Sequence, residues 1–351
     1  MTLFLYDSTT YRQDLQNAIH STKGIEKLKD CAVMVTGATG LIGSFVVDML
    51  LEYNHLQQAN ITVYALGRSE KRLRERFDGA VANGLHFVEQ DVNCAPNFDF
   101  DVDYIIHAAS NAYPAAFASD PVGTILSNVL GVKYLLEYAK QHAAKRLLFV
   151  SSGEVYGQGD PALEAFPEHY SGYVDPTKAR SCYPASKRAA ETLCVSYTQQ
   201  YGLDTVIVRP CHTYGPNTTG SDNRANVQFV NNAIAGEDIV MQSRGTQMRS
   251  YCYIADCASA LLTVLLCGES CEAYNLANPN ARVTIAGFAE TVAAVTGRRV
   301  VFADEQDVPK NQQTPITYAV LDSEKLCALG WEGKYTVKDG VNNTVRVLTG
   351  K

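Results

Sequence analysis

Between Cys31 and Pro210 the chain alternates short, β-branched apolar runs with longer amphipathic stretches, and this alternation limits the fold more than any other feature. Short runs of this kind are typical of buried strands, and the longer stretches of helices. Strands that alternate with helices form βαβ units, whose strands are parallel. We therefore expect an α/β fold with a doubly wound parallel sheet. The predicted strands are residues 32–36, 61–66, 85–88, 104–107, 146–150 and 205–208, and the predicted helices include 43–53, 121–141 and 184–201.

Length and a change in composition predict further parts. A chain of 351 residues exceeds what one hydrophobic core usually supports. Residues 1–30 are polar and are predicted to form a helical N-terminal extension, and residues 31–210 the main sheet domain. After residue 210 the alternation fades, so we expect residues 211–351 to form a smaller mixed α/β lobe that binds the substrate. Some segments of this lobe could return to the main domain, and the sequence leaves that open.

Charge and cysteine usage exclude several classes of protein. The net charge of −7 argues against a nucleic-acid partner. No apolar run approaches the roughly 20 residues that cross a bilayer, and the N-terminus lacks the pattern of a signal peptide. The ten cysteines are scattered without a Cys-x-x-Cys motif or a nearby histidine pair. We therefore expect reduced thiols, no metal site, no membrane partner and a cytoplasmic location.

A glycine-rich turn follows the first predicted strand. Glycine permits the tight turn, lets the backbone approach a pyrophosphate, and lets the next helix pack closely with its N-terminus towards the phosphates. The spacing is Gly-x-x-Gly-x-x-Gly rather than Gly-x-Gly-x-x-Gly, and a purely structural turn is the alternative. In its strand–turn–helix context the pattern predicts dinucleotide binding. The candidate contacts are Gly37, Thr39, Gly40, Leu41, Ile42 and Gly43.

Small and polar residues follow the other predicted strands. Ligands bind outside the carboxyl ends of a parallel sheet, so these residues are predicted to line the same crevice. No acidic residue follows the second strand to hold a ribose 2′-hydroxyl, and Arg68 stands there instead. Arg68 is suited to a 2′-phosphate or is simply solvated, so both NAD and NADP stay open. The further candidate cofactor contacts are Asp91, Val92, Ala108, Ala109, Ser110, Ser151, Tyr183, Lys187, Pro210 and His212.

Tyr183 and Lys187 form the most informative pair. Pro184 is predicted to be the first helical residue, which places Tyr183 at the helix entry and Lys187 one turn later on the same face. A phenol with a pKa of about 10 is a poor base at neutral pH. A nearby ammonium, the helix N-terminus and a cationic nicotinamide should lower that pKa. Ser152 would then bond the substrate oxygen that Tyr183 deprotonates, while hydride moves to the nicotinamide.

These motifs resemble the extended short-chain dehydrogenase/reductase superfamily, from about Cys31 to the C-terminus. Within it the chain resembles enzymes of the epimerase/dehydratase family that act on nucleotide-activated sugars, in particular UDP-glucuronate decarboxylases and 4-epimerases. The residues that carry the resemblance are Thr36-Gly-x-x-Gly-x-x-Gly43, Asn128, Ser152-x-x-Val155-Tyr-Gly157, Tyr183-x-x-x-Lys187, Gly245-Thr-Gln-Met-Arg-Ser-Tyr251 and Leu329-Gly-Trp331.

The resemblance implies a Rossmann domain over residues 31–210, a bound NAD or NADP, and a nucleotide-diphosphate sugar as substrate. Asn128 and Ser151 would support the cofactor and the active site, whereas Arg249 would face the diphosphate and Gln228 the sugar nucleotide. Ser110, Ser152 and His212 are the other implied substrate contacts. The family also implies a homodimer joined by the helices 121–141 and 184–201, although burial against the sheet explains their apolar faces equally well.

The chain departs from the family pattern at several positions. Gly153 and Glu154 stand where dehydratases have Asp-Glu, which argues against a 4,6-dehydratase and leaves Glu154 as the candidate acid/base. His212 replaces a usual asparagine and either titrates near neutral pH or donates a hydrogen bond. No arginine for the nucleotide is evident in Asp307–Thr317, so the base stays open.

Three functions are compatible with this pattern. The first is a redox-neutral epimerase or decarboxylase that works through a 4-keto sugar, with Tyr183, Lys187, Ser152 and Glu154 as catalytic residues. The second is a reductase that consumes NAD(P)H on a keto-sugar nucleotide. The third is a non-catalytic protein that senses the dinucleotide, which the intact Tyr/Lys pair disfavours.

Overall fold

The computed structural model describes residues 5–80, 83–160, 162–220, 222–303 and 318–351. Within these ranges, seven parallel strands form one sheet in the order β10-β6-β5-β4-β1-β2-β3. The strand order reverses between β1 and β4, which is the point where a doubly wound sheet binds its ligand. The prediction of a doubly wound parallel sheet is therefore confirmed. The strands are β1 (Ala32–Thr36), β2 (Thr62–Gly67), β3 (Leu85–Glu89), β4 (Tyr104–His107), β5 (Arg146–Val150), β6 (Thr205–Pro210) and β10 (Ala273–Leu276).

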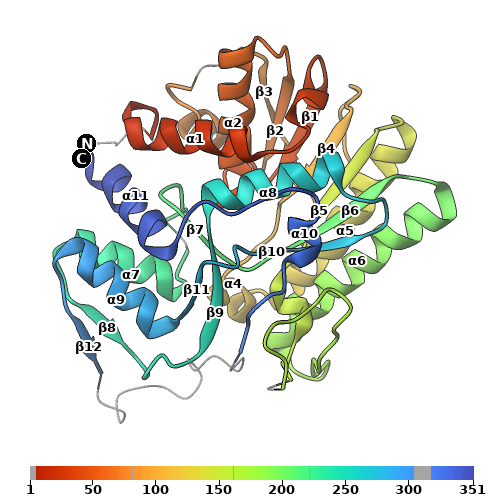
Figure 1. The fold of residues 1–351 in the computed structure, drawn as a ribbon. Coiled ribbons are helices and arrows are strands. Elements are labelled where there is room, and N and C mark those ends of the chain that lie inside the picture. Colours follow the sequence, from red (N-terminus) through yellow and green to blue (C-terminus); the bar gives the residue numbers. More distant parts are fainter. Residues whose placement is uncertain (1–4, 81–82, 161, 221, 304–317) are drawn as a thin grey trace.

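Helices cover both faces of this sheet (Figure 1). Val33 and Val35 of β1 pack into one core with α2 (Leu41–Gln57) and α8 (Ile254–Cys267). Met34 points to the opposite face and packs into a second core with α5 (Pro121–Gln141) and α6 (Cys182–Tyr201). This strict alternation follows from the two-residue period of a strand that is buried on both sides.

The smaller lobe carries two small sheets. One has the order β11-β9-β7 and the other pairs β12 with β8. Figure 1 shows these strands with α7, α9 and α11 at the left and lower left, beside the main sheet. Their bounds are β7 (His212–Tyr214), β8 (Ile239–Met241), β9 (Met248–Tyr253), β11 (Arg282–Thr284), β12 (Val300–Phe302), α7 (Ala225–Ile234), α9 (Ile285–Thr296) and α11 (Val337–Thr349).

Two elements beyond residue 210 lie in the main domain: β10 pairs with β6, and α8 packs on the face that carries α2. The division at residue 210 as a domain boundary stays a prediction. The remaining helices are α1 (Thr9–Ser21), α3 (Glu70–Arg76), α4 (Pro114–Ser119) and α10 (Glu324–Cys327), with short 3₁₀ turns η1 (Leu5–Asp7), η2 (Ile25–Leu28), η3 (Gly153–Tyr156) and η4 (Ala179–Ser181). In the part of the chain that the structure describes, no helix combines the length and apolarity needed to cross a membrane.

The predicted start of the helix 184–201 is wrong. Helix α6 begins at Cys182, two residues before Pro184, so Tyr183 lies inside the first turn and not at its entry. Pro184 is tolerated there because the first-turn N–H groups of a helix have no intrahelical acceptor. Lys187 still lies one turn after Tyr183, so the pair keeps its common face.

The buried carboxylate of Asp48 attaches α1 and its neighbouring segments to the main domain. Asp48 of α2 accepts hydrogen bonds from Tyr6 and Tyr11 at 2.5 Å each, and Arg76 of α3 pairs with it at 2.6 Å. The Asp48 side chain is fully buried and that of Arg76 is 14% exposed. Because unpaired charges are costly in the interior, this network ties three segments together.

Candidate active site

The glycine turn is too crowded for a side chain at Gly37 or Gly43. Gly37 has a φ of +67°, and a Cβ there would lie 2.8 Å from the backbone of Ala108 and Ala109. A Cβ on Gly43 would lie 2.4 Å from the carbonyl oxygen of Gly37. Gly40 is the N-cap of α2 and has no side chain that could bond the first helical N–H groups. Those donors face the turn, and such an arrangement fits a dinucleotide pyrophosphate.

A buried hydrogen bond connects this turn to the end of β4. Thr36 Oγ1 and His107 Nδ1 lie 2.7 Å apart, and the Ala109 N–H donates to the same hydroxyl at 3.3 Å. Burial, with a contribution from the charge of Lys187, lowers the pKa of His107 to about 3. The imidazole is therefore neutral at pH 7, and its bond to Thr36 joins the ends of β1 and β4. Sequence analysis did not single out this pair.

A chain of hydrogen bonds runs from the end of β4 to α6 through the predicted residue Asn128. Ser110 donates to the Asn128 side-chain oxygen at 2.9 Å, and Asn128 Nδ2 donates to Ser186 Oγ at 2.9 Å. Ser186 in turn donates to the Cys182 carbonyl at 2.5 Å, in the first turn of α6. Asn128 is fully buried. It therefore links β4 and α5 to the helix that carries Tyr183.

Tyr183 and Lys187 lie beside the end of β5. Lys187 is 2% exposed, and its ammonium donates to the Val150 carbonyl at 2.7 Å. Burial lowers the pKa of Lys187 to about 7, against the opposing charge of Glu191. Burial and the charge of Glu154 raise the pKa of Tyr183 to about 12, despite a hydrogen bond with Ser152.

The protein groups alone therefore raise the pKa of Tyr183, whereas the expected lowering included a bound cationic nicotinamide. The ring is 5% exposed, and removing a phenolate from water outweighs the neighbouring cations. A bound cationic nicotinamide would add the positive charge that this balance lacks.

Glu154 forms an ion pair at the mouth of the site. Arg180, in the turn before α6, donates to both of its carboxylate oxygens at 3.2 and 3.0 Å. The Arg180 guanidinium also lies 4.8 Å from the centre of the Phe117 ring, which stacks on Tyr183 at 4.5 Å. Ser152 accepts from the Glu154 N–H at 3.1 Å. Sequence analysis missed Arg180 and Phe117, although Arg180 precedes Tyr183 by only three residues.

The other candidate cofactor contacts follow the carboxyl ends of β2, β3 and β5. Arg68 follows β2 and is exposed. Asp91 accepts from the Asn93 N–H at 2.9 Å, and Val92 lies next to the position where a Cβ on Gly131 would project, at 3.3 Å. Ser151 is 4% exposed, and its hydroxyl has no hydrogen-bond partner among the described residues. A buried, unsatisfied hydroxyl at the end of β5 fits a bound polar ligand.

The candidate substrate residues fall into two groups. His212 of β7 lies opposite Tyr251 of β9, the strand that carries Arg249. Burial and the charges of Arg249 and Arg224 lower the pKa of His212 to about 3. Titration of His212 near neutral pH is therefore wrong. Arg249 is 2% exposed and donates to the Met248 carbonyl at 2.9 Å. Gln228 instead is exposed on α7 and donates to the Asn223 carbonyl at 2.9 Å.

Pro210 ends β6 in a buried position. The segment Asp307–Thr317 lies outside the described residues. The individual roles of all these candidate residues stay predictions.

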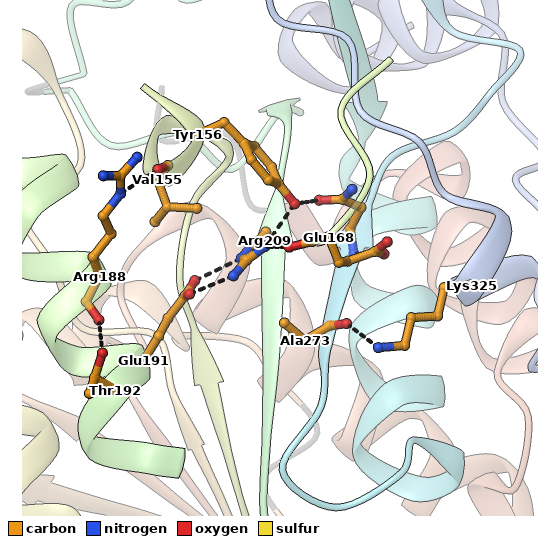
Figure 2. Close-up of polar contacts among 10 residues, drawn as sticks. Val155, Tyr156, Glu168, Arg188, Glu191, Thr192, Arg209, Ala273 and Lys325 are labelled. Atoms are coloured by element: carbon orange, nitrogen blue, oxygen red, sulfur yellow. Dashed lines mark hydrogen bonds and ion pairs between the residues drawn. The ribbon is translucent and has the colours of Figure 1, made fainter. Parts of the chain in front are cut away.

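Arg209 of β6 connects α6 to η3 (Figure 2). Its guanidinium holds both oxygens of Glu191, at 2.9 and 2.7 Å, and donates to the Tyr156 hydroxyl at 2.9 Å. It also donates to the Glu168 carbonyl at 2.7 Å. Glu191 belongs to α6 and Tyr156 to η3, so one side chain braces the segments that carry Tyr183 and Ser152.

Comparison with known proteins defines the class to which this fold and site belong. Residues 33–277 match the model of the NAD dependent epimerase/dehydratase family. The chain therefore belongs to this family of NAD-dependent enzymes, which modify nucleotide sugars.

Individual relatives are more specific. UDP-glucuronic acid decarboxylase 5 of Arabidopsis thaliana is 33% identical over 317 residues, which are 88% of this chain and 86% of that protein. UDP-glucuronic acid decarboxylase 1 of Xenopus tropicalis is 32% identical over 316 residues, or 89% of this chain and 71% of that protein. Among solved structures, an epimerase from Methanothermobacter thermautotrophicus has a TM-score of 0.80 at 21% identity and covers 94% of this chain and 95% of its own. A Thermus thermophilus UDP-glucose 4-epimerase in complex with NAD has a TM-score of 0.73 at 25% identity, covering 91% and 99%.

Proposed function

We propose that this chain oxidises the 4-hydroxyl of a nucleotide-diphosphate sugar to a ketone and later reduces that ketone again. The observation that carries the proposal is the Tyr183 phenol, buried beside Ser152 with Lys187 one helical turn away. A hydroxyl, a phenol and an ammonium at the carboxyl edge of a doubly wound sheet suit proton removal from an alcohol. The family match supports the same chemistry.

The residues of the crevice would divide the work. The glycine turn would hold the pyrophosphate of the cofactor, and Lys187 and Asn128 would order its nicotinamide half. When bound, the nicotinamide supplies an acceptor for the hydride of the 4-carbon and a donor for its return. Ser152 would orient the 4-hydroxyl, and Tyr183 would take its proton and give it back. Arg249 would hold the diphosphate, for which a guanidinium is well suited.

We further propose a uronic acid sugar and decarboxylation over epimerisation. Oxidation at the 4-carbon makes a β-keto acid of a glucuronate, which loses CO₂ readily because the ketone accepts the electron pair that the carboxylate releases. The decarboxylases named above support this choice. Glu154 would donate or accept the proton that moves at the neighbouring carbon. Epimerisation at the 4-carbon is the alternative within the same mechanism.

The runner-up is a reductase that consumes NADPH, for which the exposed Arg68 at the end of β2 is the favouring observation. Denaturing the freshly purified chain and identifying the released nicotinamide by mass and absorbance separates the two. We expect retained NAD, because an enzyme that returns its hydride each cycle has no need to exchange cofactor. An empty site that takes up NADPH would instead favour the reductase and give Arg68 a phosphate to bind.

We propose that the chain forms a homodimer through α5 and α6. On α5, Val122, Ile125 and Leu126 are 65%, 41% and 44% exposed, which is unusual for neighbouring apolar residues on one helix. Leu126→Asp is expected to convert a dimer into a monomer in analytical ultracentrifugation, because burying a carboxylate in an apolar interface is costly. Val240→Asp, at a 45% exposed position on β8, is the matched control and should stay dimeric. A monomeric wild type, or a dimeric L126D, would contradict the proposal.

We propose a reducing compartment such as the cytoplasm. All ten cysteines are free thiols, and several are buried in the core. Disulfides are rare in the cytosol because thiols there are kept reduced.

A further inference from the structure

Arg180 lies at the mouth of the site, and its ion pair with Glu154 uses only part of its guanidinium. Both hydrogen bonds to the Glu154 carboxylate, at 3.2 and 3.0 Å, come from one nitrogen, Nη2. A guanidinium carries five N–H donors on three nitrogens. Among the described residues, none accepts a hydrogen bond from Nε or Nη1 of Arg180, and the side chain is 41% exposed. Two nitrogens of this cation therefore remain available to a second acceptor.

Aromatic rings and the chain itself place this cation next to the proposed catalytic phenol. The Arg180 guanidinium lies 4.8 Å from the centre of the Phe117 ring, and that ring stacks on Tyr183 at 4.5 Å with an angle of 23° between the planes. Both rings are buried. Arg180 also precedes Tyr183 by three residues, in the turn η4 that continues directly into α6.

Other arginines of the neighbouring segments are fully occupied by protein acceptors. Arg209 uses all three of its nitrogens on Glu191, Tyr156 and a backbone carbonyl. Arg224 likewise uses Nε and Nη2 on the carboxylate of Asp222, at 2.5 to 3.0 Å, and Nη1 on a backbone carbonyl at 3.3 Å. Arg180 differs from both in having donors that no described residue accepts.

The carboxylate of a uronic acid sugar has to enter beside these groups. It belongs to the carbon next to the one that the proposed function oxidises, and Ser152 and Tyr183 are proposed to place the hydroxyl of that oxidised carbon. Glu154 follows closely, because its N–H donates to the Ser152 hydroxyl at 3.1 Å. The Glu154 carboxylate by itself repels a second carboxylate, whereas the cation of Arg180 attracts both.

We propose that Arg180 is a specificity-determining residue, whose remaining N–H donors bind the carboxylate of a uronic acid sugar while Nη2 keeps Glu154. Charge-assisted hydrogen bonds from a guanidinium suit this task. The result is a preference for an acidic sugar over a neutral sugar on the same nucleotide. This inference rests on the proposed function, since it takes Ser152 and Tyr183 to position the 4-hydroxyl.

The test compares the binding of two ligands that differ at this carboxylate, UDP-glucuronate and UDP-glucose. Isothermal titration calorimetry measures both affinities with the full chain loaded with NAD, in a Tyr183→Phe background that prevents turnover. Arg180→Gln removes the charge, and Arg180→Lys keeps it. Lys178→Gln is the matched control, because it removes an exposed positive charge two residues away. Circular dichroism checks folding, and Arg180→Met takes the place of R180Q if that variant does not fold.

We expect the preference for UDP-glucuronate over UDP-glucose to fall by about tenfold or more in R180Q, because a hydrogen-bonded charge pair is lost. R180K should keep most of the preference, and K178Q should keep all of it. A purely structural role of Arg180 would weaken the binding of both ligands equally. An unchanged preference in R180Q, or equal affinities for the two ligands before Arg180 is replaced, would overturn the proposal.

The double variant E154Q/R180Q separates attraction by Arg180 from repulsion by an unpaired Glu154. We expect the preference to stay lost, since the group that binds the carboxylate is absent. A preference restored to its original level would show that only the charge of Glu154 mattered, and would overturn the proposal.

Failure of the proposed function gives a different result. A preference that depends on Arg180, in a chain that releases no CO₂ from UDP-glucuronate when Tyr183 is present, would support the carboxylate subsite and remove decarboxylation. Turnover of UDP-glucose together with equal affinities for the two ligands would overturn the subsite and leave oxidation at the 4-carbon in place. Binding of neither ligand would overturn both.

Discussion

Replacing Tyr183 with phenylalanine is expected to lower kcat by about 10²- to 10⁴-fold, the range that a positioned acid–base group contributes. The ring is buried, stacks on Phe117 at 4.5 Å and bonds Ser152 only through its hydroxyl. Phenylalanine therefore keeps the packing and removes the one atom that would exchange a proton with the sugar. Cofactor affinity should be unchanged, because the glycine turn lies on another strand and keeps its shape.

The measurement is steady-state turnover of UDP-glucuronate, with cofactor affinity from nicotinamide fluorescence. Tyr201→Phe is the matched control, since Tyr201 ends the same helix and is 47% exposed. Full activity in Y183F would remove Tyr183 from the mechanism. Equal loss in Y201F would point to a general effect on α6.

Replacing Asp48 with alanine is expected to lower the free energy of unfolding by about 3–5 kcal/mol, as breaking a buried ion pair does. The carboxylate is fully buried, accepts hydrogen bonds from Tyr6 and Tyr11, and forms an ion pair with Arg76. Its removal leaves a mostly buried guanidinium and two phenols without their acceptor. The helical segment before β1 should then separate from α2 more easily.

Urea unfolding followed by circular dichroism measures this loss. Glu75→Ala provides the control on the adjoining α3, because its pair with Lys71 is 3.8 Å long and its side chain is 62% exposed. Exposed pairs of this kind contribute about 0–1 kcal/mol. A loss below about 1 kcal/mol in D48A would show that water or rearranged side chains satisfy the network.

The main sheet could be predicted because each of its first six strands carries its own local signal. The predicted ranges 32–36, 104–107 and 146–150 match β1, β4 and β5, and the long helix 121–141 matches α5. The seventh strand could not be assigned to the sheet in advance. β10 has only four residues, and its place beside β6 is decided by long-range packing after a separate lobe has intervened.

The candidate site divides in the same way. Gly37, Tyr183 and Lys187 could be found because each belongs to a motif that is defined by residue spacing along the chain. The predicted strands and helices around these motifs made the assignment more specific. Arg180 and Phe117 could not, since they meet Tyr183 only through contacts between separate segments. The raised pKa of Tyr183 could not be predicted because it is caused by burial, which no local pattern reports.

The central claim is that the sugar is oxidised and reduced again at one carbon within a single catalytic cycle. UDP-glucuronate carrying deuterium at the 4-carbon tests it most directly, with the product analysed by NMR and mass spectrometry and CO₂ measured in parallel. We expect a pentose nucleotide that retains the deuterium at the 4-carbon, one equivalent of CO₂, and no net change in cofactor absorbance. Loss of the deuterium to solvent, or net consumption of reduced cofactor, would contradict the account.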